Sequence, residues 1–96
     1  MLIDKGVTKG EVITIKLTSG EELVARLEEE TDTHYKLTKP MVLTGTAQGL
    51  GMMPYLFTSG VSKDVPLNKS AISVVMPTEK DYADQYTQST TSIKLV

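Results

Sequence analysis

The sequence predicts a small all-β protein: a strongly bent, five-stranded antiparallel barrel followed by a C-terminal helix. Apolar and polar residues alternate with a period of two over much of residues 12–43, as they do in strands with one buried face. Short turn signals rich in Gly, Ser, Asp and Pro separate these segments. Residues 78–88 carry a helix-start pattern instead. Ninety-six residues, of which 40% are hydrophobic, predict a single domain over residues 1–96.

The first two strands have the clearest alternation. The apolar positions of residues 12–18 are Ile13, Ile15 and Leu17. Ser19-Gly20-Glu21 then predicts a turn, because glycine readily takes a positive φ. In the second strand one predicted face carries Leu23, Ala25 and Leu27, and the other carries Glu22, Val24, Arg26 and Glu28.

The third strand follows a polar hairpin tip at residues 29–32. Tyr35 and Leu37 are predicted on its inner face. Lys39-Pro40 is expected to interrupt the ladder, because proline lacks the N–H that a central strand needs. The apolar run resumes over residues 41–43, so these three strands are predicted to form an antiparallel meander.

The second half of the chain gives weaker signals. Residues 45–54 are rich in Gly and Met and show no clear period. Residues 55–57 are predicted as a short strand, 59–66 as a loop and 70–76 as the last strand of a barrel over residues 10–77. Thr78 is predicted to cap a helix over residues 78–88, with Tyr82 and Tyr86 on one face against the barrel. Residues 89–96 are predicted as a tail.

Composition restricts the function. A formal charge of −2 speaks against indiscriminate binding to nucleic acid, which needs clustered Lys and Arg. The absence of cysteine and the single histidine predict no disulfide and no protein-bound metal. The sequence has no run of about 20 apolar residues, the length that a membrane span needs. It also lacks the basic and then apolar start that is typical of a secretory signal. We therefore expect a soluble cytoplasmic protein.

Three segments resemble the two motifs of the Sm/LSm family. Residues 17–27 (LTSGEELVARL) and 35–40 (YKLTKP) resemble its first motif, with Ala25 where the family usually has glycine. Residues 68–77 (NKSAISVVMP) resemble the second motif of the bacterial Hfq-like branch, which runs Tyr-Lys-His and then Ala-Ile-Ser. The resemblance covers about residues 10–77. The long Gly/Met segment and the helix are similar to those of divergent, phage-encoded members.

The resemblance implies a ring with a pore that binds single-stranded RNA. Lys69 keeps the lysine of the pore motif, while Asn68 and Ser70 replace its tyrosine and histidine. His34 or Tyr35 would stack a base, and Lys36 replaces the asparagine of the first motif. The simpler interpretation makes His34 a solvated hairpin residue and Tyr35 a core residue. One lysine per subunit, repeated around a ring, would still give a concentrated positive circle.

Two functions remain open, and the resemblance favours the first. The first is a homo-oligomeric ring of roughly five to seven subunits that binds single-stranded RNA through these six residues. The second is an assembly or scaffold ring that has lost RNA binding and docks protein partners through the Gly/Met segment and the helix. Core packing is the preferred role of the apolar cluster in that segment, which comprises Leu50, Met52, Met53, Tyr55 and Phe57. No catalytic set or phosphate-binding loop emerges, so we expect neither enzymatic activity nor a cofactor.

Overall fold

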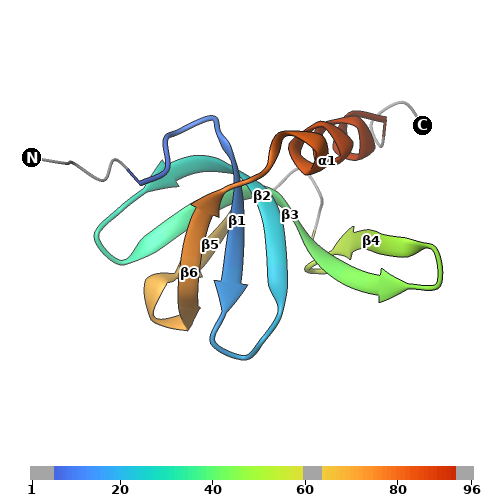
Figure 1. Ribbon diagram of the computed structural model, residues 1–96. Helices are drawn as coiled ribbons and strands as arrows, with labels where there is room; N and C mark the ends of the chain where they lie inside the picture. The colour runs from blue at the N-terminus through green and yellow to red at the C-terminus, as the bar shows by residue number, and fades with distance from the viewer. Residues whose placement is uncertain (1–5, 60–63, 93–96) are drawn as a thin grey trace, which may run out of the picture.

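The computed structural model describes residues 6–59 and 64–92, which form six strands, a 3₁₀ turn and a helix (Figure 1). In chain order they are β1 (Val12–Leu17), β2 (Glu22–Glu30), β3 (His34–Thr46), β4 (Gly49–Pro54), β5 (Asp64–Asn68), η1 (Lys69–Ala71), β6 (Ile72–Pro77) and α1 (Lys80–Ser92). All strand pairs are antiparallel, which confirms the predicted class. The predicted five-stranded barrel is wrong: the described residues form a six-stranded sheet that does not close, in the order β4-β3-β2-β1-β6 with β5 also paired to β3.

The inner face of the sheet carries the main hydrophobic core, as the alternation predicts. The antiparallel pairing of β1 with β2 sets Ile13 opposite Ala25 and Ile15 opposite Leu23. All four side chains are fully buried. The buried members of this inner core are Ile13, Ile15, Leu17, Leu23, Ala25, Leu27, Leu37 and Leu67. Each large member contributes about 1.5–3 kcal/mol relative to an exposed position.

β3 bends at Lys39-Pro40 without ending there. Lys39 has a φ of 49°, in the left-handed region, and the pairing of β2 with β3 shifts register between Val24 and Arg26. A β-bulge of this kind kinks a strand and increases its twist. The first half of β3 therefore pairs with β5 and its second half with β4. The predicted interruption at Pro40 is a bulge inside one long strand.

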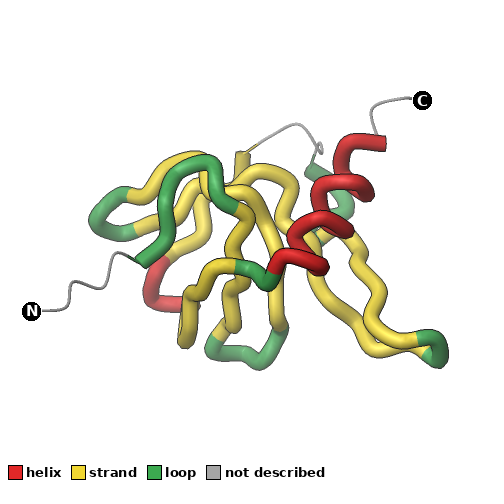
Figure 2. Tube along the Cα trace, turned by 45° about the horizontal axis from the view of Figure 1, so that its top comes forward, coloured by secondary structure: helices red, strands yellow, loops and turns green. Residues whose placement is uncertain are grey.

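The second half of β3 and β4 form a hairpin, residues 41–54, that projects from the rest of the sheet (Figures 1 and 2). We call this hairpin the arm. Its pairing runs from Met41 opposite Pro54 to Thr46 opposite Gly49, and Gly49 supports the tight turn with a φ of 119°. The prediction of a strand at residues 55–57 is wrong. The strand that pairs with β3 is β4, which lies earlier in the chain, in a segment whose sequence shows no period.

β5 occupies part of the segment that was predicted as a loop. Residues 60–63 lie outside the described residues, but from Asp64 onward the chain pairs with β3, Pro66 standing opposite Lys36. A proline is tolerated on an edge strand because its missing N–H need not face a partner. β6 follows the prediction closely, although Ser70 and Ala71 belong to the 3₁₀ turn before it.

α1 lies across the outer face of the sheet and forms a second core there (Figure 2). Tyr86 is buried against Val12, Val24 and Met41, which explains why Val24 is apolar on the predicted solvent face. The helix begins two residues later and ends four residues later than predicted, so residues 89–92 are helical rather than a tail. The described residues contain no helix of the length and apolar character that a bilayer crossing requires.

One detail of the predicted helix is wrong and a second is confirmed only in part. Thr78 precedes α1, and its hydroxyl pairs with the hydroxyl of Thr14 at 2.8 Å rather than capping the helix. Tyr82 does not share the buried position of Tyr86, since 38% of it is exposed. A spacing of four residues places side chains on neighbouring parts of one helix face, and here that face only partly meets the sheet.

Candidate functional site

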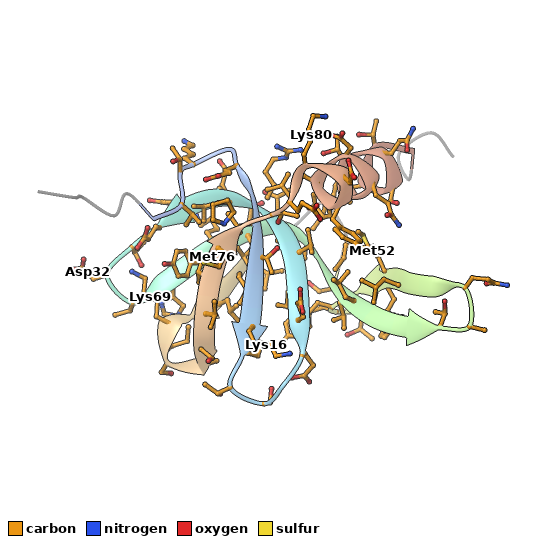
Figure 3. All side chains as sticks on the ribbon, viewed as in Figure 1. Lys16, Asp32, Met52, Lys69, Met76 and Lys80 are labelled. Carbon is orange, nitrogen blue, oxygen red and sulfur yellow. The ribbon has the colours of Figure 1, made fainter. Side chains whose placement is uncertain are left out.

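The six residues of the predicted RNA site lie at one end of the sheet, where the β2–β3 hairpin meets β5 and η1. The register sets His34 opposite Asn68, and Tyr35 opposite Leu67. The backbone N–H of Lys69 donates to the carbonyl of Thr33 at 2.8 Å, which fixes η1 beside the hairpin. We call this group of residues the hairpin-end cluster; it comprises His34, Tyr35, Lys36, Asn68, Lys69 and Ser70. Figure 3 shows Lys69 and Asp32 at this end of the molecule.

Lys69 is held by an acidic partner and an aromatic ring. Its Nζ donates to Oε2 of Glu30 at 2.7 Å and lies 5.0 Å from the centre of the Tyr35 ring, within cation–π range. The hydrogen bond that Lys69 donates to Glu30 is the main reason why the pKa of Lys69 is raised. Desolvation, followed by the charge of Glu30, raises the pKa of Tyr35. The lysine therefore stays charged, but its charge is largely matched by the carboxylate.

Lys36 is paired in the same way. Its Nζ lies 3.4 Å from Oε1 of Glu29, because β2–β3 pairing sets Glu29 opposite Lys36 and Glu30 opposite Tyr35. With Asp32 at the tip, three carboxylates accompany two lysines, and the formal charge of these five groups is −1. A site that attracts phosphate needs an excess of positive charge.

The remaining members of the cluster stabilise local backbone. Asn68 Oδ1 accepts from the N–H of Ser70 at 2.9 Å and so caps the 3₁₀ turn. His34 is half-buried, and its Nδ1 forms a hydrogen bond of 2.7 Å with the hydroxyl of Thr33. Ser70 is exposed. These contacts are sufficient to explain Asn68 and His34 without a ligand.

Sequence reasoning missed the role of Glu29 and Glu30, which it treated as solvated charges at a hairpin tip. The signal that identifies them is the register: once the hairpin turns at residues 31–33, Glu30 must stand opposite Tyr35 and next to the lysine that follows β5. A register shift between Leu27 and Glu29 sets this pairing, and period-two alternation alone does not reveal it. Among residues 6–59 and 64–92, no three His, Cys, Asp or Glu side chains converge in a way that could hold a metal ion.

No protein-family model matches this sequence, and no curated protein matches it either. The site is therefore interpreted from its own geometry.

Proposed function

We propose that this protein is a non-enzymatic assembly protein whose copies join through their strand edges into a closed, Sm-like ring of roughly five to seven subunits. The observation that carries the proposal is the pair of free edges at opposite ends of one sheet. In the described residues β4 pairs only with β3, and β6 pairs only with β1. An unpaired edge presents rows of N–H and C=O groups that accept another strand.

β4 and β6 match each other as partners. Each strand has six residues, and their prolines, Pro54 and Pro77, stand at the ends. β5 has Pro66 at its centre, which removes a donor and makes that edge a poorer partner. Both matched edges carry exposed apolar side chains: 49% of Leu50 on β4 and 56% of Met76 on β6 remain accessible. Pairing β4 of one copy with β6 of the next would cover both strands.

The contact is heterologous, because it joins two different surfaces. Such contacts generate a ring when the rotation between subunits closes and a filament when it does not. The resemblance of residues 17–40 and 68–77 to Sm motifs favours the ring.

Charged substitutions at the edge test the proposal. Met76→Lys introduces a desolvated charge into the proposed contact, so it should dissociate the ring in size-exclusion chromatography with light scattering. Gln85→Lys, on the exposed surface of α1, adds the same charge away from both edges and should leave the ring intact. Equal masses for these two variants and the wild type would contradict β6 as an assembly edge.

RNA binding at the hairpin-end cluster is a second proposal, supported by the placement of Lys69 over Tyr35 beside His34. An aromatic ring can stack a base while a neighbouring cation holds its phosphate, and base stacking contributes about 1–3 kcal/mol. Glu30 opposes this function because its carboxylate forms an ion pair with Lys69. RNA binding therefore ranks below assembly.

Opposite effects of two substitutions test the RNA proposal. Glu30→Gln frees Lys69 and should strengthen binding of a labelled oligo(U) in a fluorescence titration. Lys69→Ala should weaken it and flatten its dependence on salt. Oligo(A) in parallel measures base preference. If wild type and Glu30→Gln both fail to bind at concentrations near 10⁻⁴ M, the weak end of non-specific affinity, the cluster has only a structural role.

A further inference from the structure

A cavity of ≈ 240 Å³ lies between the outer face of the sheet and the first turn of α1. Its sheet side is formed by residues of β1, β2, β3 and β4, and its other side by the residues that lead into the helix. The lining residues are Thr14, Glu22, Val24, Leu43, Leu50, Thr78, Glu79 and Tyr82. The cavity lies on the helix-covered face, away from the inner core; Met52 packs against the second core beside it (Figure 3).

The chemistry of the lining is apolar at the floor and anionic at the walls. Val24, Leu43 and Leu50 supply the apolar floor. Glu22 and Glu79 supply two carboxylates. In the described part of the chain neither of them forms an ion pair, because the ion pairs there join other residues. Lys16 stands opposite Glu22 in the register but does not line the cavity.

These features specify the occupant by its charge and shape. An anionic wall above an apolar floor fits a cation on a hydrocarbon stem, with apolar groups on either side. Tyr82 adds an aromatic ring that is suited to a cation. A lysine flanked by large apolar residues has these properties.

Three lysines of this chain have that pattern: Lys16, Lys36 and Lys94. Lys16 and Lys36 lie in β1 and β3, where their neighbours Ile15, Leu17 and Leu37 are buried in the inner core, so Lys94 is the remaining candidate. Residues 93–96, which lie outside the described residues, read Ile-Lys-Leu-Val, so Lys94 is flanked by Ile93 and Leu95. The other terminal segment, residues 1–5, places Asp4 next to Lys5, and this acid would be repelled by the carboxylates of the wall.

Lys94 would need full extension to reach the cavity of its own chain. α1 rises about 1.5 Å per residue, so Ser92 stands about 20 Å along the helix from Glu79, at the end away from the cavity. Two extended residues span at most about 7 Å, and the lysine side chain adds about 6 Å. The segment therefore meets the cavity with less constraint in another copy.

We propose that residues 93–96 of one copy dock into this cavity of a second copy, with Lys94 between the carboxylates of Glu22 and Glu79 and its apolar neighbours over Leu43 and Leu50. The proposal deepens the self-assembly proposed above and rests on it. The tail contact would add a second link between copies besides the edge pairing.

A labelled peptide of residues 91–96 tests the contact by fluorescence anisotropy. The receiving protein is the full chain with Lys94→Glu, whose own segment no longer competes. We expect saturable binding. Adding Glu79→Lys to the receiving protein should weaken it about two- to fivefold, as loss of an exposed ion pair does. Asp81→Lys makes the same charge change in the first turn of α1, outside the cavity lining, and should leave binding unchanged.

A charge-reversed pair completes the test. A peptide with Lys94→Glu should bind poorly to the Lys94→Glu protein and regain affinity for the protein that also carries Glu79→Lys. Equal effects of Glu79→Lys and Asp81→Lys, or equal binding of a scrambled peptide, would overturn the proposal and leave the cavity to a different basic partner. Light scattering on the same samples separates the two proposals. If the protein forms rings but does not bind the peptide, only the tail contact is overturned. If the protein is a monomer that binds the peptide, only the edge assembly is overturned.

Discussion

The inner core and the arm belong to the same sheet but bury their apolar side chains to very different degrees. Ile13, Ile15 and Leu23 of the inner core are fully buried. Leu50 of the arm and Phe57 just beyond it keep 49% and 72% of their surface accessible. The first region uses its apolar residues to fold the chain. The second leaves them available for another molecule, as exposed apolar patches often do.

The largest expected effect lies in the inner core. Leu23→Ala removes a fully buried side chain and leaves a cavity, which should reduce the free energy of unfolding by about 2–5 kcal/mol. Urea denaturation followed by circular dichroism measures it. A loss below about 1 kcal/mol would mean that the core readily collapses around the gap, and the contrast with the arm would weaken.

An intermediate effect is expected where α1 meets the sheet. The Tyr86 hydroxyl donates toward the carbonyls of Thr38 and Lys39, at 2.7 and 2.9 Å, and accepts from the N–H of Arg26 at 3.3 Å. Tyr86→Phe should lower the free energy of unfolding by about 1–3 kcal/mol, because it leaves partly buried backbone groups without this partner. Tyr82→Phe, at a more exposed position on the same helix, is the matched control and should have a smaller effect.

The same tyrosine predicts a dependence on pH. Burial raises the pKa of Tyr86 from 10.0 to about 12. The unfolded chain therefore loses the phenolic proton at a lower pH than the folded chain does. The contribution of Tyr86 to the free energy of unfolding is complete below about pH 10 and falls as the pH rises from about 10 to 12. Tyr86→Phe should remove this part of the decline in urea titrations at pH 9 and 11. An unchanged decline in the variant would assign the pH effect to other groups.

The smallest effect on folding is expected in the exposed segment after the arm. Phe57→Ser removes an apolar side chain that is mostly accessible to solvent, so it should change the free energy of unfolding by less than about 0.5 kcal/mol. Thermal unfolding of the variant beside Leu23→Ala measures the contrast. A loss comparable to that of the core variant would show that this segment contributes to folding rather than to contacts between copies.

The inner core was predictable because burial on one face imposes a period of two on β1 and β2, and Ile13 through Leu27 follow it. β4 was not predictable in this way. Its residues lie on a projecting hairpin and are at most partly buried, with Met52 packed against the second core, so Gly49 and Gly51 carry information about turn and pairing but none about periodicity. Val24 was placed on the solvent side because its cover, Tyr86, is 62 residues away in sequence.

The candidate site was predictable in position but not in charge. The pairing of β3 with β5 brings His34 and Asn68 together, as the order of the two motifs implies. The ion pairs of Lys36 and Lys69 depend on a bulge near the end of β2, and a bulge leaves no clear pattern in a single sequence. The excess of acid over base at this end therefore emerged only from the structure.

Amide hydrogen exchange tests edge assembly most directly, because it compares the three edges in one sample. At micromolar concentration the outward amides of β4 and β6 should be protected and should lose that protection on dilution. The outward amides of β5, around Pro66, should exchange at the same rate at both concentrations. If exchange in β4 and β6 is likewise independent of concentration, these edges do not pair between copies, and the assembly proposal is contradicted.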